Sequence, residues 1–315
     1  MKPIVTLTLN PAVDSSCETE AVYPMRKIRT SNERLDPGGG GINAARVINE
    51  LGGRTFAVYL GGGTSGDVLD ELVGHAGVDY HRIHTAEPTR ISHTVLARQS
   101  GQEYRFTPEG PAIQEAEWRA AFGFLDMLDF DYLIASGSLP RGAPTDLYGQ
   151  LAEVVQSKDA RLVLDTSGPA LEAALKAPKG GSVFMAKPSL GEFKALTGAT
   201  FDTEDDIEKA MVQAIGEGLA DILAVTMGGD GAALASRDEF VTLQPPDVEI
   251  RSAVGAGDSF VGGMTFGLAQ GLPVEEAFAL GTAAGTATVL TAGTELCHRD
   301  DVNRLWDQLK QELPR

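Results

Sequence analysis

Short apolar runs alternate with amphipathic stretches along most of this chain. Runs of five to seven mostly apolar residues predict strands buried on both faces of a sheet; they lie at 5–9, 55–60, 132–136, 161–165, 182–187 and 221–227. Stretches whose apolar positions recur at helical spacing follow most of them, at 42–52, 65–77, 145–157, 203–218, 257–270, 274–290 and 299–312. This alternation predicts one α/β domain over residues 1–315, with a doubly wound, mostly parallel sheet flanked by helices.

Two segments near the amino-terminal end break this rhythm. Residues 91–106 show two strand-like stretches around a Ser-Gly turn, which predicts an antiparallel hairpin. Residues 15–35 are irregular and strand-like rather than helical. We therefore expect a small β-sheet lid, built from insertions at about 15–35 and 90–107, over one edge of the large sheet. Ordinary surface hairpins are the alternative.

The charge composition of the chain limits the kinds of molecule that it can bind. Lys and Arg number 26 against 44 Asp and Glu, a net charge of −18 in 315 residues. Such a surface repels nucleic acid and anionic membranes, so a phosphate ligand would require basic side chains to converge locally. No apolar run approaches the roughly 18 residues of a membrane span, and the first residues lack a signal-peptide pattern. The two cysteines show no metal-type spacing. We expect a cytoplasmic protein.

One motif in the chain is misleading. The sequence GGGINA at 39–44 fits a dinucleotide-binding fingerprint, which requires a buried strand just before it. The preceding residues, NERLDP, are polar and end in proline. This context argues against a nicotinamide-dependent dehydrogenase.

The segment VGAGDSF at 254–260 is a glycine-rich turn that opens a predicted helix. Free N–H groups at a helix amino terminus bind anions, so the backbone of Gly255, Ala256 and Gly257 predicts an anion hole. Phosphoryl transfer also needs a group that accepts the proton of the attacking hydroxyl. Asp258, in the first turn, is our candidate for this base; the alternative is an acid that only interacts with the helix dipole.

A second glycine-rich segment, DPGGGGINAAR at 36–46, also precedes a helix. Gly39 and Gly40 would let the backbone approach a ligand closely, and the amide of Asn43 can both donate to and accept from sugar hydroxyls. Asp14, which follows the first strand, could accept hydrogen bonds from a polyol. A flexible turn with a capping role, and a simple turn aspartate, are the alternatives.

Basic residues occur in both predicted lid segments. Alternation along Lys-Ile-Arg places Lys27 and Arg29 on one face of a strand, and Arg90 opens the second segment. Arginine suits bidentate phosphate binding. Each residue taken singly is also compatible with an ordinary surface charge.

Polar residues follow several predicted strands and should share one rim of the sheet, where α/β proteins bind ligands. Asp165 and Glu192 could hold Mg²⁺ through water, and Lys187 could contact a nucleotide phosphate. Ser138 is a further candidate for a ligand contact, and Thr226 with the loop containing Gly228 and Gly231 could contact the nucleotide.

Six segments in this order resemble the ribokinase, or PfkB-type, carbohydrate kinase family: LTLNPAVD (7–14), GGGGINAARVINELGG (38–53), TR (89–90), SGSLP (136–140), KPSLGE (187–192) and VGAGDS (254–259). The resemblance covers nearly the whole chain. It implies ATP- and Mg²⁺-dependent phosphorylation of a sugar phosphate. Segments 102–106 and 293–301 favour the branch that phosphorylates fructose 6-phosphate at O1. Fructose 1-phosphate or tagatose 6-phosphate are alternative substrates, and a non-catalytic sugar-phosphate sensor is an alternative of another class.

The resemblance also implies roles for single residues. Asp258 matches the family's base, and residues 255–257 match its anion hole. Contacts to the sugar are implied for Asp14, Gly39, Asn43 and Ser138, and contacts to its phosphate for Lys27, Arg29 and Arg90. A homodimer through the lids is implied, with Arg29 serving the partner's site, and K⁺ is expected near 250–254 and 288–295. Ser189, implied as a nucleotide contact, stands where the family's N-x-x-E motif has asparagine. Its hydroxyl can still bond a water or a phosphate oxygen, so reduced affinity for metal or ATP is expected rather than loss of activity.

Overall fold

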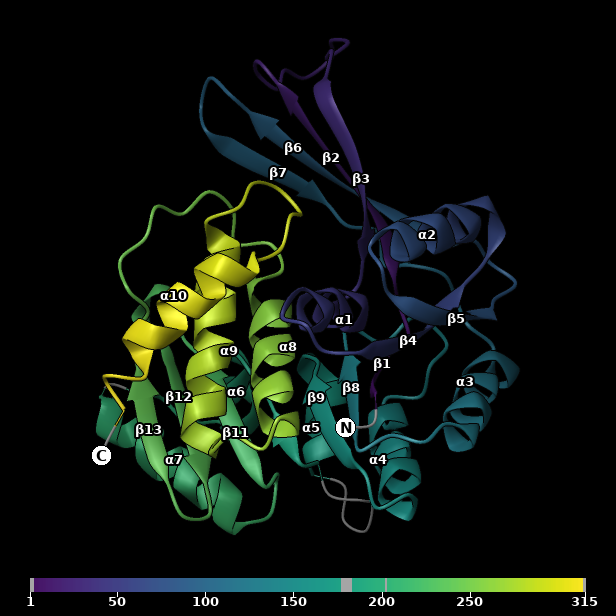
Figure 1. Cartoon of the computed structure of the whole chain (residues 1–315). Coiled ribbons are helices and arrows are strands. Elements are labelled where there is room, and N and C mark those ends of the chain that lie inside the picture. Colours follow the sequence, from purple (N-terminus) through teal and green to yellow (C-terminus); the bar gives the residue numbers. More distant parts are fainter. Residues whose placement is uncertain (1–2, 177–182, 202, 314–315) are drawn as a thin grey trace.

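The computed structural model describes residues 3–176, 183–201 and 203–313. Within them a sheet of nine strands runs in the order β13-β12-β11-β10-β9-β8-β1-β4-β5 (Figure 1). These strands are β1 (Ile4–Thr8), β4 (Thr55–Gly61), β5 (Asp79–His84), β8 (Tyr132–Ser136), β9 (Arg161–Asp165), β10 (Met185–Ala186), β11 (Ile222–Thr226), β12 (Ala232–Ser236) and β13 (Phe240–Leu243). Pairing is parallel from β11 to β5, while β12 and β13 are antiparallel. The predicted doubly wound, mostly parallel sheet is confirmed.

Helices cover both faces of this sheet. Along β1, Ile4 packs into the core on one face, and Val5 and Leu7 pack into the core on the other. The first face carries α1 (Gly40–Glu50), α2 (Gly63–His75), α8 (Ala256–Ala269), α9 (Val274–Val289) and α10 (Arg299–Leu309). The second carries α3 (Glu115–Met127), α4 (Leu147–Ser157), α5 (Gly168–Leu175), α6 (Leu190–Thr197) and α7 (Glu204–Gly216). Strands buried on both faces explain the continuous apolar runs of the sequence.

A separate four-stranded sheet projects from the large one (Figure 1). Its order is β3-β2-β6-β7, with β2 (Ala12–Thr19), β3 (Ser31–Gly38), β6 (Arg90–Ala97) and β7 (Gln102–Phe106). β2 follows β1 after three residues, so this lid rises from the carboxyl ends of the central strands. The prediction of a small second sheet is confirmed, but the prediction of a strand around Lys27 and Arg29 is wrong. Both residues lie in the exposed loop between β2 and β3.

Several elements were not predicted from the hydrophobic pattern. They are the edge strands β5 and β13, the strand β12 next to β13, and the helices α3, α5 and α6. β12 reads AALAS, and alanine and leucine do not favour a strand by propensity; pairing with β11 holds it in the sheet. Of the strand expected at 182–187, residue 182 lies outside the described residues. No helix in the described ranges is long and apolar enough to cross a membrane.

Candidate active site

The amino terminus of α8 forms the centre of the site. Gly255 caps the helix with φ of 78°, a left-handed conformation that glycine adopts without strain. Asp258 is the acidic residue of the first turn, and the Ser259 N–H donates to Gly255 O at 2.8 Å. The free N–H groups before it and the helix dipole make this turn suited to receive an anion. The turn predicted from VGAGDSF therefore has the expected geometry.

Asn43 on α1 contacts Asp258 directly. Its Nδ2 donates to Asp258 Oδ2 at 2.8 Å, across 215 positions of sequence. Burial and the negative charge of Asp165 raise the pKa of Asp258 to about 6, against the opposing effects of Asn43 and Lys187. A carboxylate with a raised pKa is a stronger base, while it remains mostly ionised at neutral pH.

Because Gly40 has no side chain, the two glycine-rich segments can lie close together. A Cβ atom at Gly40 would lie 2.0 Å from Ser136 Oγ and 3.0 Å from Asp258 Oδ1. At the preceding position, Gly39 has φ of 118° and a Cβ would lie 2.6 Å from Thr8 Cγ2. Close packing therefore requires both glycines, Gly40 against Ser136 and Asp258 and Gly39 against Thr8.

We predict that Gly40→Ala lowers kcat by about tenfold or more, because the methyl group displaces Asp258 or Ser136 from its place. Steady-state kinetics would measure the loss. Gly123→Ala is the control: this glycine lies in α3 with open space around its Cβ direction, so the exchange should leave kcat unchanged and stabilise the helix by up to about 1 kcal/mol. Equal kcat for the two variants would contradict the packing role of Gly40.

Lys187 lies beside the acidic groups of the site. Its Nζ contacts Asp165 Oδ1 at 3.1 Å, and Ser136 Oγ donates to Asp165 Oδ2 at 3.3 Å. Burial lowers the pKa of Lys187, but the Asp165 carboxylate outweighs it and the net pKa is raised, helped by the charges of Asp258 and Glu192. Lys187 is therefore a buried, charged ammonium. A Cβ at Gly257 would lie 3.4 Å from its Nζ, so it adjoins the anion hole.

Ser189 and Glu192 form a capping box at the start of α6. Glu192 Oε2 accepts from the Ser189 N–H at 2.7 Å and from Ser189 Oγ at 2.8 Å. Serine is one of the best N-cap residues, so it keeps this helix start where the family has asparagine. The described residues contain no group of three His, Cys, Asp or Glu arranged around a metal. That Asp165 and Glu192 hold Mg²⁺ through water therefore stays a prediction.

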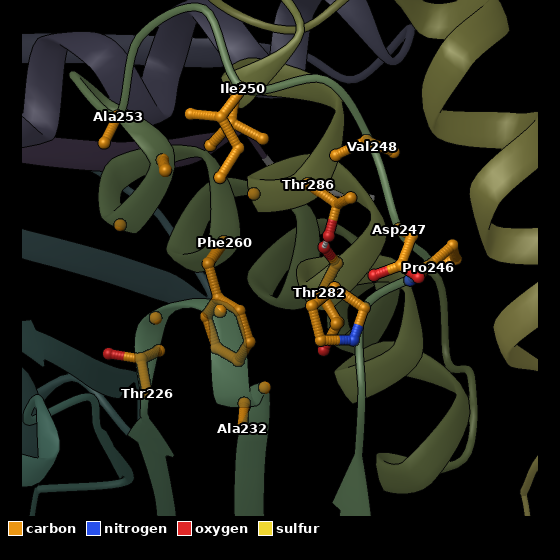
Figure 2. Close-up of a pocket in the computed structure, with 18 residues that line it drawn as sticks. Thr226, Ala232, Pro246, Asp247, Val248, Ile250, Ala253, Phe260, Thr282 and Thr286 are labelled. Atoms are coloured by element: carbon orange, nitrogen blue, oxygen red, sulfur yellow. Dashed lines mark hydrogen bonds between the residues drawn. The ribbon is translucent and has the colours of Figure 1, made fainter.

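A pocket of about 400 Å³ adjoins the anion hole, because Ala256 and Gly257 are among the residues that line it (Figure 2). α8 and α9 contribute Phe260, Thr282 and Thr286, and the segment 245–250 crosses the pocket with its apolar side chains. The predicted residues Thr226, Gly228, Gly231, Ala256 and Gly257 all line it. A pocket of this volume with mostly apolar walls is typical of a small-molecule site, and that it holds the nucleotide stays a prediction. The apolar wall at 246–250 was missed, because a segment without secondary structure has no periodic signal.

We predict that Ile250→Ala raises the KM for ATP by roughly threefold to tenfold and leaves the KM for the sugar substrate unchanged, because it removes apolar surface from the pocket wall alone. The side chain is 67% exposed, so its loss should not disturb the core. Val212→Ala, which truncates an exposed apolar side chain on α7, is the control. An unchanged KM for ATP would exclude this wall from the nucleotide site.

Asp14 and Arg90 meet where the lid joins the large sheet. The Arg90 guanidinium donates to the backbone carbonyls of Asn10 and Pro108, each at 2.8 Å. Burial raises the pKa of Asp14 to about 6, while the charges of Arg90 and Arg105 oppose this. Arg105, on β7, is a basic residue of this region that the sequence analysis missed. In the sequence Arg105 lies between Tyr104 and Phe106, and nothing in this pattern distinguishes it from an ordinary surface arginine.

Ser138 lies on the same side, joined through Asn10. The Asn10 Nδ2 donates to Ser138 Oγ at 3.2 Å, while Asn10 Oδ1 is buried and has no hydrogen-bond partner among the described residues. A buried unpaired acceptor is costly unless water or a ligand reaches it. Asn10 is thus a polar group of the site that the sequence analysis passed over.

Two predicted site residues, Lys27 and Arg29, do not lie near Asp258 of the same chain. They line a separate hollow of about 500 Å³ at the β2–β3 loop, together with Tyr23, Arg26 and Arg98. The loop between β2 and β3 lies at the end of the lid away from the large sheet (Figure 1). Segments 250–254 and 288–295, where K⁺ was expected, do lie together: the Arg251 N–H donates to Val289 O at 2.8 Å.

This arrangement matches a known family. A model described as "pfkB family carbohydrate kinase" matches residues 7–301. The chain is 37% identical over 306 residues to the ATP-dependent 6-phosphofructokinase isozyme 2 of Mycobacterium tuberculosis, covering 96% of this chain and 89% of that one. It is 36% identical to the enzyme of the same name in Escherichia coli, over 99% of this chain and 100% of the other. The chain therefore belongs to the pfkB family of carbohydrate kinases, and the prediction of an ATP-dependent sugar kinase is confirmed.

Solved structures of phosphofructokinase-2 from Escherichia coli have the same fold. One, in complex with potassium, gives a TM-score of 0.93 with 98% of this chain and 100% of that chain covered. Another, with a TM-score of 0.92 and the same coverage, is in complex with fructose-6-phosphate, and a third is a tetrameric inhibited form. A more distant relative, the 1-phosphofructokinase of Bacillus subtilis, is 30% identical over 98% of both chains. These relatives place the chain near the 6-phosphofructokinase branch predicted from its motifs.

Proposed function

We propose that this protein is an ATP-dependent 6-phosphofructokinase, which transfers the γ-phosphoryl group of ATP to O1 of fructose 6-phosphate. The observation that supports this best is the position of Asp258. Its carboxylate lies in the first turn of α8, next to the N–H groups of the turn and bonded to Asn43. Ala256 and Gly257 of that turn line the proposed nucleotide pocket, and the charge of Asp14 at the lid junction acts on Asp258.

The chemistry follows from this arrangement. Asp258 accepts the proton of the O1 hydroxyl as that oxygen bonds to the γ-phosphorus, and the bond from phosphorus to the bridging oxygen of ADP breaks. The backbone N–H groups of 255–258 face the oxygens on which charge develops, and Lys187 adds a buried positive charge. Asp165 and Glu192 would hold Mg²⁺ through water, which would supply further charge neutralisation. Because the anion hole uses backbone groups, the Asp258 carboxylate is left free to face the hydroxyl.

The phosphate already on the sugar would bind at the lid. Arg90 and Arg105 supply positive charge within the chain, and we propose that Lys27 and Arg29 reach the site of a partner subunit. Exposed apolar side chains on the lid strands, Leu35, Ile91, Leu96 and Phe106, support a homodimer formed through the lids. We propose that this dimer works in the cytoplasm with K⁺ beside the segments around Arg251 and Val289.

Other functions are less well supported. Fructose 1-phosphate and tagatose 6-phosphate offer one phosphate and similar hydroxyls, so the same site could accept them. A non-catalytic sensor would not need a carboxylate whose pKa is raised beside an anion hole, because that charge opposes phosphate binding.

A coupled assay of ADP production with the three sugar phosphates at equal concentration tests the proposal. We expect kcat/KM for fructose 6-phosphate to exceed the others by about tenfold or more. A higher value for fructose 1-phosphate or tagatose 6-phosphate would reassign the substrate. Absence of ADP production with all three would contradict the kinase activity on sugar phosphates.

A further inference from the structure

The side chain of Asn43 is held from both ends by charged groups. Its Nδ2 donates to Asp258 Oδ2 at 2.8 Å, and its Oδ1 accepts from Arg46 Nη1 at 3.1 Å. Asn43 and Arg46 lie three residues apart on α1, so their side chains share one face of the helix. Asn43 is 8% exposed and the Arg46 side chain 14% exposed, so water does not readily replace either contact.

Chemistry decides which way this amide points. A guanidinium has only donors and an ionised carboxylate only acceptors, whereas an asparagine amide has one end of each kind. With Arg46 at its oxygen, Asn43 must direct its NH₂ group to Asp258. Without Arg46 the amide could turn over, and its oxygen would then face the carboxylate and repel it. Arg46 also donates to Pro37 O at 3.3 Å, which fixes the guanidinium against the glycine-rich segment.

The network continues into the lid through Asp36. Asp36, on β3, is 5% exposed, and its Oδ1 lies 3.9 Å from Arg46 Nη2. Its Oδ2 accepts from Thr294 Oγ1 at 2.5 Å and contacts Arg34 Nε at 2.8 Å. One buried carboxylate therefore joins a lid strand, the segment around Thr294 and the guanidinium that orients Asn43.

We propose that Arg46 is a positioning residue of the reaction: held by Asp36, it fixes the orientation of the Asn43 amide and, through it, the Asp258 carboxylate. Arg46 does not touch the substrate in this proposal. Other charged groups around Asp258 are Asp165 on β9, Lys187 after β10 and Asp14 on β2, and none of them bonds the Asn43 amide. The proposal rests on the proposed role of Asp258 as base.

A double-mutant cycle with Asn43 tests it. Arg46→Met is expected to lower kcat by about tenfold, because the orientation of the base is lost, with the KM for ATP within about twofold of wild type, because Arg46 does not line the nucleotide pocket. Asn43→Ala is expected to lower kcat by a similar or larger factor. If Arg46 acts through Asn43, adding Arg46→Met to Asn43→Ala should change kcat by less than about twofold, which is a strongly non-additive result.

Arg34→Met is the matched control. Arg34 contacts the same Asp36 carboxylate, but it is 48% exposed and does not contact Asn43, so kcat should stay near wild type. Thermal unfolding checks that each variant folds. If Arg46→Met does not fold, Arg46→Lys, which keeps a positive charge and a donor, replaces it in the same cycle with a smaller expected loss.

Two results would overturn the proposal: losses of kcat that multiply in the double variant, or an unchanged kcat in a folded Arg46→Met protein. Assays use the sugar phosphate on which the wild-type enzyme is most active, so a different substrate preference would affect only the proposed function. If wild type phosphorylated none, the same cycle measured on the free energy of unfolding would test the Arg46–Asn43 coupling by itself. Additive changes in the free energy of unfolding would then contradict the coupling between Arg46 and Asn43.

Discussion

Asp258→Asn is expected to lower kcat by about 10²-fold or more while the KM values for ATP and the sugar phosphate change little. Asparagine has nearly the same shape and can still accept from Asn43 through its carbonyl oxygen, but it cannot take the proton of the attacking hydroxyl. Steady-state kinetics with both substrates varied would separate kcat from KM. A near-normal kcat would show that Asp258 is not the base.

The same substitution should stabilise the protein free of ligand at pH 8. Folding raises the pKa of Asp258 from its ordinary value of 3.8 to about 6, so the folded state disfavours the charged form. A raised carboxyl pKa costs stability above that pKa, and the cost vanishes as pH falls below the unfolded value. Asparagine removes this cost, so the free energy of unfolding at pH 8 should rise by about 1–3 kcal/mol.

Denaturant unfolding at pH 8 and pH 5 would measure the stability difference between wild type and Asp258→Asn. The difference should narrow at pH 5, because Asp258 of the wild type is then mostly protonated. A destabilised variant at pH 8 would show that the carboxylate is held favourably in its charged form. Lost activity together with gained stability is the expected combination for a group that serves catalysis rather than folding.

Arg90→Ala is expected to raise the KM for the sugar phosphate by about 10²-fold and the KM for ATP by less than about twofold. Arg90 starts β6 at the base of the lid, beside Asp14 and away from the nucleotide pocket. Its contacts to the carbonyls of Asn10 and Pro108 hold the guanidinium in place for a phosphate.

Those backbone contacts are also compatible with a purely structural role for Arg90. The KM values for the sugar phosphate and for ATP distinguish this role from phosphate binding. An equal rise in both would indicate a general disturbance of the lid junction and refute the role as a sugar-phosphate clamp. Arg119→Ala, which removes an exposed arginine paired with Glu115 on α3, should change neither KM.

Elements with a strong and uninterrupted hydrophobic pattern were predictable from sequence, and the others were not. The central strands β1, β4, β8, β9 and β11 are buried on both faces and read as apolar runs. β5, at the edge of the large sheet, is largely polar, and α5 and α6 are eight residues long. Patterns this short or mixed do not separate a strand or a helix from a loop.

Within the site, the residues that could be predicted lie in segments with a recognisable local sequence pattern. Glycines that open a helix mark the turn of Gly255 and the segment around Gly40, whatever lies next to them in space. Arg46, Asn10 and the wall at Ile250 carry no such signal. Their importance depends on which groups face them in the folded chain, as Asn43 and Asp36 face Arg46.

The sequence by itself determined the alternation of buried strands and helices, the two glycine-rich helix starts and the acid that follows the second. These features depend on residues close together in the chain. Only the tertiary structure decided that Asn43 meets Asp258 across 215 positions, that Lys187 pairs with Asp165, and that Lys27 and Arg29 lie away from both. Such contacts depend on the order of strands in the sheet and on the path of the lid, which local patterns do not encode.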